Sequence, residues 1–133
     1  MCSPLRSNFS IRCEMAIELN KDQRLAINRY LEILLQKYGQ QVSEVILFGS
    51  IARGDFTGES DIDLLVVTVD GGQKLRDEIS MSCFDIILET DVILSPLVMD
   101  AETYKWHEKY EDPLYNHIKR DGIQLWKKKP EFL

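Results

Sequence analysis

Two short apolar runs near the middle of the chain constrain its fold more than any other feature. Val45 to Phe48 is an uninterrupted apolar segment, and Ile62 to Val69 is rich in β-branched residues. Runs of this length are typical of strands that are buried in a sheet. The first run stops at Gly49-Ser50 and the second at Asp70-Gly71-Gly72, and such glycine-containing ends are typical of turns. These features predict two neighbouring strands of a sheet that helices cover.

Helical periodicity flanks the two strands. Over Lys21–Tyr38 the apolar residues recur at helical spacing, Asn20 can cap the start and Gly39 can close the end. A second amphipathic helix is predicted after the second strand. Its apolar face is formed by Leu75, Ile79, Cys83, Ile86 and Ile87.

The sequence of the last third of the chain predicts an edge strand, short helices and a short final strand. Val92 to Val98 has strand character, and Pro96 within it favours an edge position or an early end. Asp100 and the Asp112-Pro113 pair are typical of helix starts. Ile123 to Trp126 predicts a short final strand. Helices and strands therefore alternate along the chain.

This order predicts an α/β (α+β) fold in which a small mixed sheet is flanked by helices. A chain of 133 residues is one domain's worth. Residues 1–14 carry no periodic pattern, and we expect a disordered tail there, followed by a single domain over residues 15–133.

Composition narrows the range of functions. Acidic side chains outnumber basic ones, 22 against 16, and the net charge of −6 disfavours binding to nucleic acid through its phosphates. No apolar run approaches the roughly 20 residues that cross a bilayer, so no membrane span is expected. Cys2, Cys13 and Cys83 lack the spacing of a zinc site or a redox pair, and we expect reduced thiols in a cytoplasmic protein.

Two aspartates introduce the second apolar run. Asp61 and Asp63 stand at positions i and i+2, so on a strand they point to the same face, with Cα atoms about 6.6 Å apart. Two bare carboxylates at that distance repel by about 2.5 kcal/mol when the effective dielectric constant is near 20. Because the adjoining strand is strongly apolar, a hard divalent cation is the natural occupant between them.

The end of the first run adds a place for phosphate. Gly49-Ser50 ends a buried strand and opens a helical turn, where free backbone N–H groups converge and glycine lets a phosphate approach. Together with the aspartate pair, this cradle predicts a site for a nucleoside triphosphate with magnesium. Asp91, ahead of the third strand, is the expected third carboxylate. Asp85 is the alternative, although its place in a predicted helix favours a solvated acid.

These residues also form a recognisable pattern. G-S-x-A-R-G over Gly49 to Gly54, followed by S-D-x-D-L over Ser60 to Leu64, resembles the nucleotidyltransferase superfamily of the DNA polymerase β type. More narrowly, the chain resembles the small MNT-type nucleotidyltransferases, the antitoxins of HEPN–MNT toxin–antitoxin pairs. The resemblance is sharp from Val45 to Val67 and continues from Asp91 to Val98. It implies a nucleotidyltransferase fold like the palm of polymerase β.

The resemblance also implies a mechanism. By this match Asp61 and Asp63 bind two magnesium ions, and Asp91 binds the metal near the acceptor and helps to remove the hydroxyl proton. Gly49 and Ser50 hold the outgoing pyrophosphate. The implied reaction transfers a nucleoside monophosphate, AMP from ATP, to a hydroxyl group.

The role of Arg53 has two alternatives, and the acceptor group has to be supplied from somewhere. Arg53 can neutralise phosphate charge, or it can pair with a local acid such as Asp55 or Glu59. Because almost everything predicted after Val98 is short helices, too little for a large acceptor domain, we expect a partner protein to present the acceptor in trans. The resemblance implies that this partner is a HEPN-type toxin modified on a tyrosine.

Two other functions compete with this interpretation. One is a nucleotidyltransferase with a small-molecule acceptor, working as a homodimer. The other is a non-catalytic module that neutralises a toxin by covering it. Intact Asp61, Asp63, Asp91 and Gly49-Ser50 favour catalysis. Self-association through the sheet edge at Pro96 is a further open alternative.

Overall fold

The strands form one mixed sheet in the computed structural model, which describes residues 19–49, 61–70 and 72–128. The strand order is β3-β2-β1-β4; β1 is antiparallel to β2 and to β4, whereas β2 and β3 are parallel. The described elements are α2 (Lys21–Tyr38), β1 (Val42–Phe48), β2 (Ile62–Thr68), α4 (Gly72–Met81), α5 (Cys83–Thr90), β3 (Leu94–Asp100), α6 (Ala101–Tyr110), α7 (Pro113–Asp121) and β4 (Ile123–Lys127).

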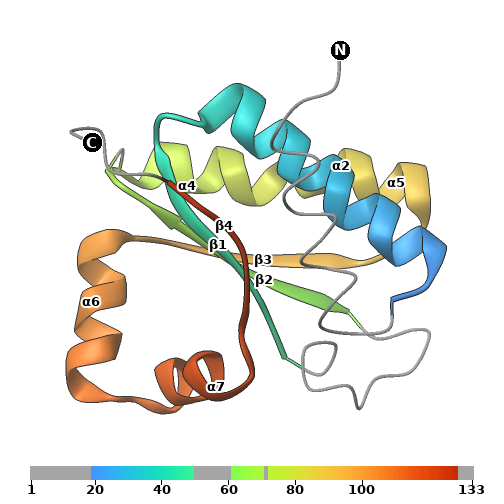
Figure 1. The fold of residues 1–133 in the computed structure, drawn as a ribbon. Helices are drawn as coiled ribbons and strands as arrows, with labels where there is room; N and C mark the ends of the chain where they lie inside the picture. The colour runs from blue at the N-terminus through green and yellow to red at the C-terminus, as the bar shows by residue number, and fades with distance from the viewer. Residues whose placement is uncertain (1–18, 50–60, 71, 129–133) are drawn as a thin grey trace.

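Helices cover both faces of this sheet. Figure 1 shows α2, α4 and α5 on one face and α6 and α7 on the other. The parallel pairing of β2 and β3 requires a crossover connection, which α4 and α5 provide. The fold is therefore the predicted small mixed sheet flanked by helices.

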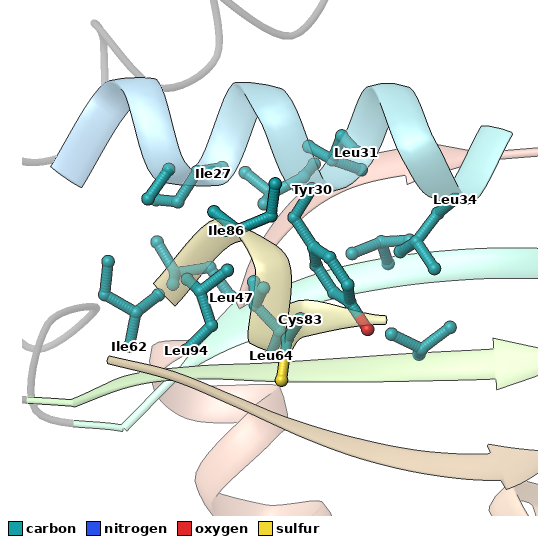
Figure 2. Close-up of a cluster of buried hydrophobic side chains, with 14 of the residues drawn as sticks. Ile27, Tyr30, Leu31, Leu34, Leu47, Ile62, Leu64, Cys83, Ile86 and Leu94 are labelled. Atoms are coloured by element: carbon teal, nitrogen blue, oxygen red, sulfur yellow. The ribbon is translucent and has the colours of Figure 1, made fainter. Parts of the chain in front are cut away.

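The main core lies between the sheet and the face that α2, α4 and α5 cover. The side chains of α2 meet those of α5 and the strands there, and Figure 2 shows Ile27, Leu31, Leu64, Cys83 and Ile86 among them. Cys83 is a free, buried thiol in this cluster, in agreement with its predicted place on an apolar helix face. Tyr30 is fully buried, and its hydroxyl donates a hydrogen bond of 2.7 Å to the Ile79 carbonyl of α4.

A smaller core lies on the opposite face of the sheet. Its buried residues come from three strands and from α7, and they are Ile46, Leu65, Val67, Met99 and Ile118. Side chains of α6 and α7, Tyr104 and Leu114 among them, pack against this cluster. Because side chains alternate along a strand, Leu64 and Val66 face the main core while Leu65 and Val67 face the smaller one.

Most element predictions are confirmed with small shifts. The helix over Lys21–Tyr38 has the predicted limits, and Asn20 and Gln23 cap its start reciprocally in a capping box. The predicted second amphipathic helix is divided into α4 and α5 at Ser82. The Ser82 hydroxyl donates to the Ile79 carbonyl at 2.6 Å, a local side-chain bond that competes with regular helical pairing.

The strand that contains Pro96 is an edge strand, as predicted. The Ile93 carbonyl accepts the N–H of Ile62, so alternate residues from Ile93 onward direct their backbone groups toward β2. Leu94, Pro96 and Val98 direct theirs away from the sheet. The N–H that proline lacks would therefore point outward, and no bond to β2 is lost.

Some sequence predictions fall outside the described residues. These are the tail over residues 1–14, the helical turn predicted from Ser50 to Arg53, and the environment of Cys2 and Cys13. Within the described part of the chain, no helix combines the length and apolar character needed to cross a membrane.

Candidate active site

Three segments of the chain meet at one end of the strands, and this end is called the site edge of the sheet. Because β1 and β2 are antiparallel, the end of β1 at Phe48 lies beside the start of β2, where Phe48 is paired with Asp63. Because β2 and β3 are parallel, the start of β3 lies there too, and Asp63 is paired with Ser95. The topology thus gathers Gly49, the start of β2 with Asp63, and the segment that leads into β3 at one end of the strands.

Strand register also fixes which face these side chains occupy. Phe48, Asp63 and Ser95 form one row across three strands, on the same face as the smaller core. Leu65, two residues after Asp63, is fully buried there, whereas Asp63 is partly exposed. Asp61, two residues earlier, is exposed. Asp63 therefore lies on this face beyond its buried part, and the alternation predicts the same face for Asp61, which directly precedes β2.

Gly49 lies directly against one of these carboxylates. Its φ of +82° belongs to the left-handed region that favours glycine. A Cβ atom at this position would overlap Asp63 Oδ2 and lie 3.0 Å from Asp63 Cγ. Only a bare backbone fits between the end of β1 and the Asp63 side chain. The glycine at the bend and the second aspartate are therefore parts of one arrangement.

Asp91 occupies a different place from the one predicted. It was expected to open a strand over Val92 to Val98, but β3 begins at Leu94. Asp91 instead closes α5 with a left-handed backbone (φ 61°, ψ 21°), and its N–H donates to the Ile87 carbonyl at 2.8 Å. An aspartate tolerates this conformation at a helix C-terminus better than most residues, because its short polar side chain can bond locally.

Register places the third strand relative to the aspartate pair. Ser95 is level with Asp63, and continuing the pairing by two residues puts Ile93 level with Asp61. Asp91 lies at the same edge of the sheet but two further residues back along the chain. Among residues 19–49, 61–70 and 72–128, no three Asp, Glu, His or Cys side chains gather closely enough to hold a metal ion. The metal roles of Asp61, Asp63 and Asp91 stay predictions.

The other predicted site residues are placed as follows. Asp85 is exposed in the first turn of α5, in agreement with a solvated helix acid. Ser50 and Arg53 lie outside the described residues. Ser95 was not among the predicted site residues, and the register alone brings it next to Asp63. The sequence feature that could have indicated Ser95 is its polar side chain at a strand position between the apolar residues Ile93 and Leu97.

The donor set at this edge fits magnesium bound together with a triphosphate. Mg²⁺ commonly uses one or two protein carboxylates, and water and substrate phosphates complete its six oxygen ligands. Asp61 and Asp63 offer carboxylate oxygens beside the end of β1, and the Asp63 carboxylate fills the space where a side chain at position 49 would stand. These carboxylates can therefore bind a hard cation next to the backbone of Gly49.

Comparisons with known proteins identify the family of the chain. The sequence pattern of the nucleotidyltransferase domain family matches residues 27–123, which include β1, β2, β3 and the first residue of β4. A protein of Methanocaldococcus jannaschii that is provisionally named a protein adenylyltransferase is 30% identical over 105 residues. That alignment covers 79% of this chain and 99% of the relative.

Solved structures share the fold. The crystal structure of a protein from Sulfolobus solfataricus, provisionally named a nucleotidyltransferase, has a TM-score of 0.50 at 21% identity and covers 96% of this chain and 91% of that one. A mutant form of the toxin–antitoxin pair MntA-HpeT has a TM-score of 0.50 at 22% identity, with 84% and 76% covered. At this level of identity, the likeness establishes the fold alone.

Proposed function

Because this chain belongs to the nucleotidyltransferase domain family, we propose that it transfers AMP from ATP to a hydroxyl group of a partner protein. The observation that carries this proposal is the contact between the bare backbone of Gly49 and the Asp63 carboxylate, at the edge where Asp61 also lies. A nucleoside triphosphate with magnesium can use carboxylates to hold the cation and nearby backbone N–H groups to bind its phosphates.

The reaction breaks one bond and forms another. The acceptor oxygen bonds to the α-phosphorus of ATP, the bond from that phosphorus to the bridging oxygen breaks, and pyrophosphate leaves with the electron pair. The acceptor proton passes to a carboxylate of the site, for which Asp91 is our candidate, or to water. Magnesium, when bound, would offset the negative charge of the phosphates.

Each residue of the chain has a distinct task in this proposal. Asp61 and Asp63 would hold the magnesium ions on one face of β2, and two ions are expected. Gly49 would let the β- and γ-phosphates approach the end of β1, and Ser50 would donate a hydrogen bond to them. Arg53 would offset phosphate charge.

The partner is proposed to be a HEPN-type toxin. Three observations support this: the resemblance to MNT-type antitoxins, the M. jannaschii relative named for protein adenylylation, and the toxin–antitoxin pair among the structures that share the fold. The net charge of −6 also suits a basic partner, because opposite charges steer association.

The proposal is tested with ATP labelled at the α-phosphate, magnesium and the product of the neighbouring gene. We expect label on that protein, and Asp63→Asn should lower the rate at least about 100-fold because a preorganised charge is removed. Asp85→Asn, which changes an equally acidic but exposed residue of α5, is the matched control and should keep the wild-type rate.

Other results would select the competing functions. Label on a small molecule and not on a protein would favour a small-molecule acceptor. A stable complex with the partner, no label on it and no effect of Asp63→Asn would favour a non-catalytic module. A rate that falls with Asp85→Asn but not with Asp91→Asn would move the third carboxylate to Asp85.

A further inference from the structure

Beside the candidate site two large apolar side chains are exposed, one directly before β3 and one within it. Ile93 is 46% exposed and Leu97 is 38% exposed, whereas Met99, the next residue in the same alternation, is 7% exposed and belongs to the smaller core. Leu94 and Val98, between them in sequence, pack on the main core. Ile93, Ser95 and Leu97 therefore form a row on the face that carries Asp63, and we name this row the β3 shelf.

The β3 shelf lies on one side of Asp63 and Gly49 lies on the other. Ser95 on β3 is paired with Asp63, and Asp63 is paired on its other side with Phe48, the residue before Gly49. In an in-line displacement the attacking oxygen enters opposite the leaving group. If the pyrophosphate leaves on the side of Gly49, the acceptor hydroxyl enters from the side of β3.

We propose that the β3 shelf binds the acceptor as an extended polypeptide segment with apolar side chains two residues before and two residues after the residue that carries the hydroxyl. This proposal rests on the proposed function. Alternate residues of an extended chain are about 6.6 Å apart, both in β3 and in such a segment. With the acceptor residue over Ser95, its neighbours at −2 and +2 lie over Ile93 and Leu97.

Charge and hydration favour the same acceptor. Asp61 and Asp91 are exposed at this edge and would repel acidic side chains of a substrate. Ile93 and Leu97 expose apolar surface beside the polar site, and apolar side chains of a substrate that covered them would remove that surface from water. Covering Ile93 and Leu97 would also exclude water from the neighbourhood of the acceptor hydroxyl, which favours transfer to that hydroxyl over hydrolysis.

Two synthetic peptides test this proposal with the full chain. Both carry one central tyrosine; the first has leucine at −2 and +2, and the second has serine at both positions. We expect kcat/KM for AMP transfer to be about tenfold higher for the leucine peptide, mainly through KM, as for the loss of small apolar contacts in a substrate site. The preference should disappear in Ile93→Ser and in Leu97→Ser.

Control variants separate the shelf from general effects. Leu88→Ser changes another exposed leucine, 84% exposed on α5 at the opposite side of the sheet, and should keep the preference. Ile93→Val keeps an apolar side chain and should retain it as well. Thermal unfolding of each variant shows whether it is folded.

Each remaining outcome counts against a specific claim. Equal rates for the two peptides in the wild type, or an unchanged preference in Leu97→Ser, would overturn the β3 shelf. Hydrolysis of ATP to AMP and pyrophosphate without labelling of either peptide would overturn it too. An absence of pyrophosphate release with every acceptor would instead refute the proposed function on which the shelf rests.

Discussion

The tightest constraint at the scale of single residues is the contact between Gly49 and Asp63. Gly49→Ala forces a Cβ atom into Asp63 Oδ2, so the carboxylate or the end of β1 must move. A displacement of about 1 Å in a catalytic arrangement costs on the order of 100-fold in rate. We therefore expect Gly49→Ala to slow AMP transfer by about this factor, measured at saturating ATP.

Gly72 provides the matched control for this change. Its φ of +71° gives alanine a similar backbone strain, but a Cβ atom there meets nothing within 4 Å. Each alanine variant should lose about 1–2 kcal/mol of stability from the left-handed backbone. Gly72→Ala should keep the wild-type rate, and equal rates for the two variants would show that the contact with Asp63 has no catalytic role.

The sequence predicts some site residues better than others. Strand alternation depends only on local spacing and predicts that Asp61 and Asp63 share a face, and the register assigns Asp63 to the face of the smaller core. Ser95 reaches Asp63 through the pairing of two strands that α4 and α5 separate in the chain, and local patterns do not set that register. Asp91 was placed on a strand because Val92 and Ile93 continue an apolar run, while its left-handed helix-ending backbone has no signal in that run.

At the scale of elements, Tyr30 connects α2 to the end of α4. Burial raises the pKa of its phenol, so the hydroxyl stays protonated and donates to the Ile79 carbonyl. Tyr30→Phe removes this bond but leaves the carbonyl paired with Ser82, and we expect a loss of about 1 kcal/mol in the free energy of unfolding. Chemical denaturation measures it.

Tyr38→Phe is the corresponding control on the same helix. The Tyr38 hydroxyl makes an exposed contact of 3.5 Å with Glu78, which contributes little because water competes for both groups. Its removal should leave the midpoint of denaturation unchanged. If both variants lose the same stability, the buried bond to Ile79 is not what distinguishes Tyr30.

Asp100 connects a second pair of elements and makes stability depend on pH. It caps α6 by accepting the Thr103 N–H at 2.7 Å and lies 3.6 Å from Arg76 of α4. The hydrogen bonds from Thr103, and then the charge of Arg76, hold the pKa of Asp100 below its usual value. A lowered pKa stabilises the fold above the unfolded pKa of about 3.9, and this stability is lost as pH falls through the folded pKa.

Asp100→Asn isolates this contribution because asparagine still caps a helix but does not ionise. We expect the wild type to unfold at a higher temperature than the variant at pH 7. The difference should shrink as the pH falls below about 4. A difference that is constant from pH 7 to pH 3 would contradict the role of the Asp100 charge.

Elements with strong local signals were predicted most closely. The helix over Lys21–Tyr38 has both apolar periodicity and a capping residue, and its limits are those predicted. The region from Leu75 to Ile87 keeps helical periodicity through Ser82, which itself has a right-handed helical backbone, so the pattern gives no sign of the division. Strand limits moved because pairing partners, and not the run of apolar residues, determine where a ladder ends.

At the scale of the whole molecule, ligand binding should stabilise the fold. A non-hydrolysable ATP analogue with magnesium, at 100 times its dissociation constant, adds about 2.7 kcal/mol to the free energy of unfolding. For a domain of this size that raises the melting temperature by roughly 10 °C. Scanning calorimetry of the wild type should show this increase, and Asp63→Asn should not. An equal shift in both proteins would place the nucleotide elsewhere.

The order in which the strands pair was the feature of the fold that the sequence predicted least. The alternation of helices and strands indicated the fold class and an edge place for the strand with Pro96. The sequence did not indicate that β4, the last strand along the chain, pairs with β1 on the far side from β3. That pairing joins Leu47 to Ile123 across most of the chain, and such distant contacts leave no local pattern.

The outward-facing nitrogen of Pro96 has a consequence for the protein at high concentration. A strand of another molecule that paired with the exposed edge of β3 would lack one hydrogen-bond donor, at Pro96 in the middle of β3. Templated stacking into fibrils needs an unbroken series of donors and acceptors. The β3 shelf can therefore remain exposed to solvent, because the strand edge beside it does not readily pair with other molecules.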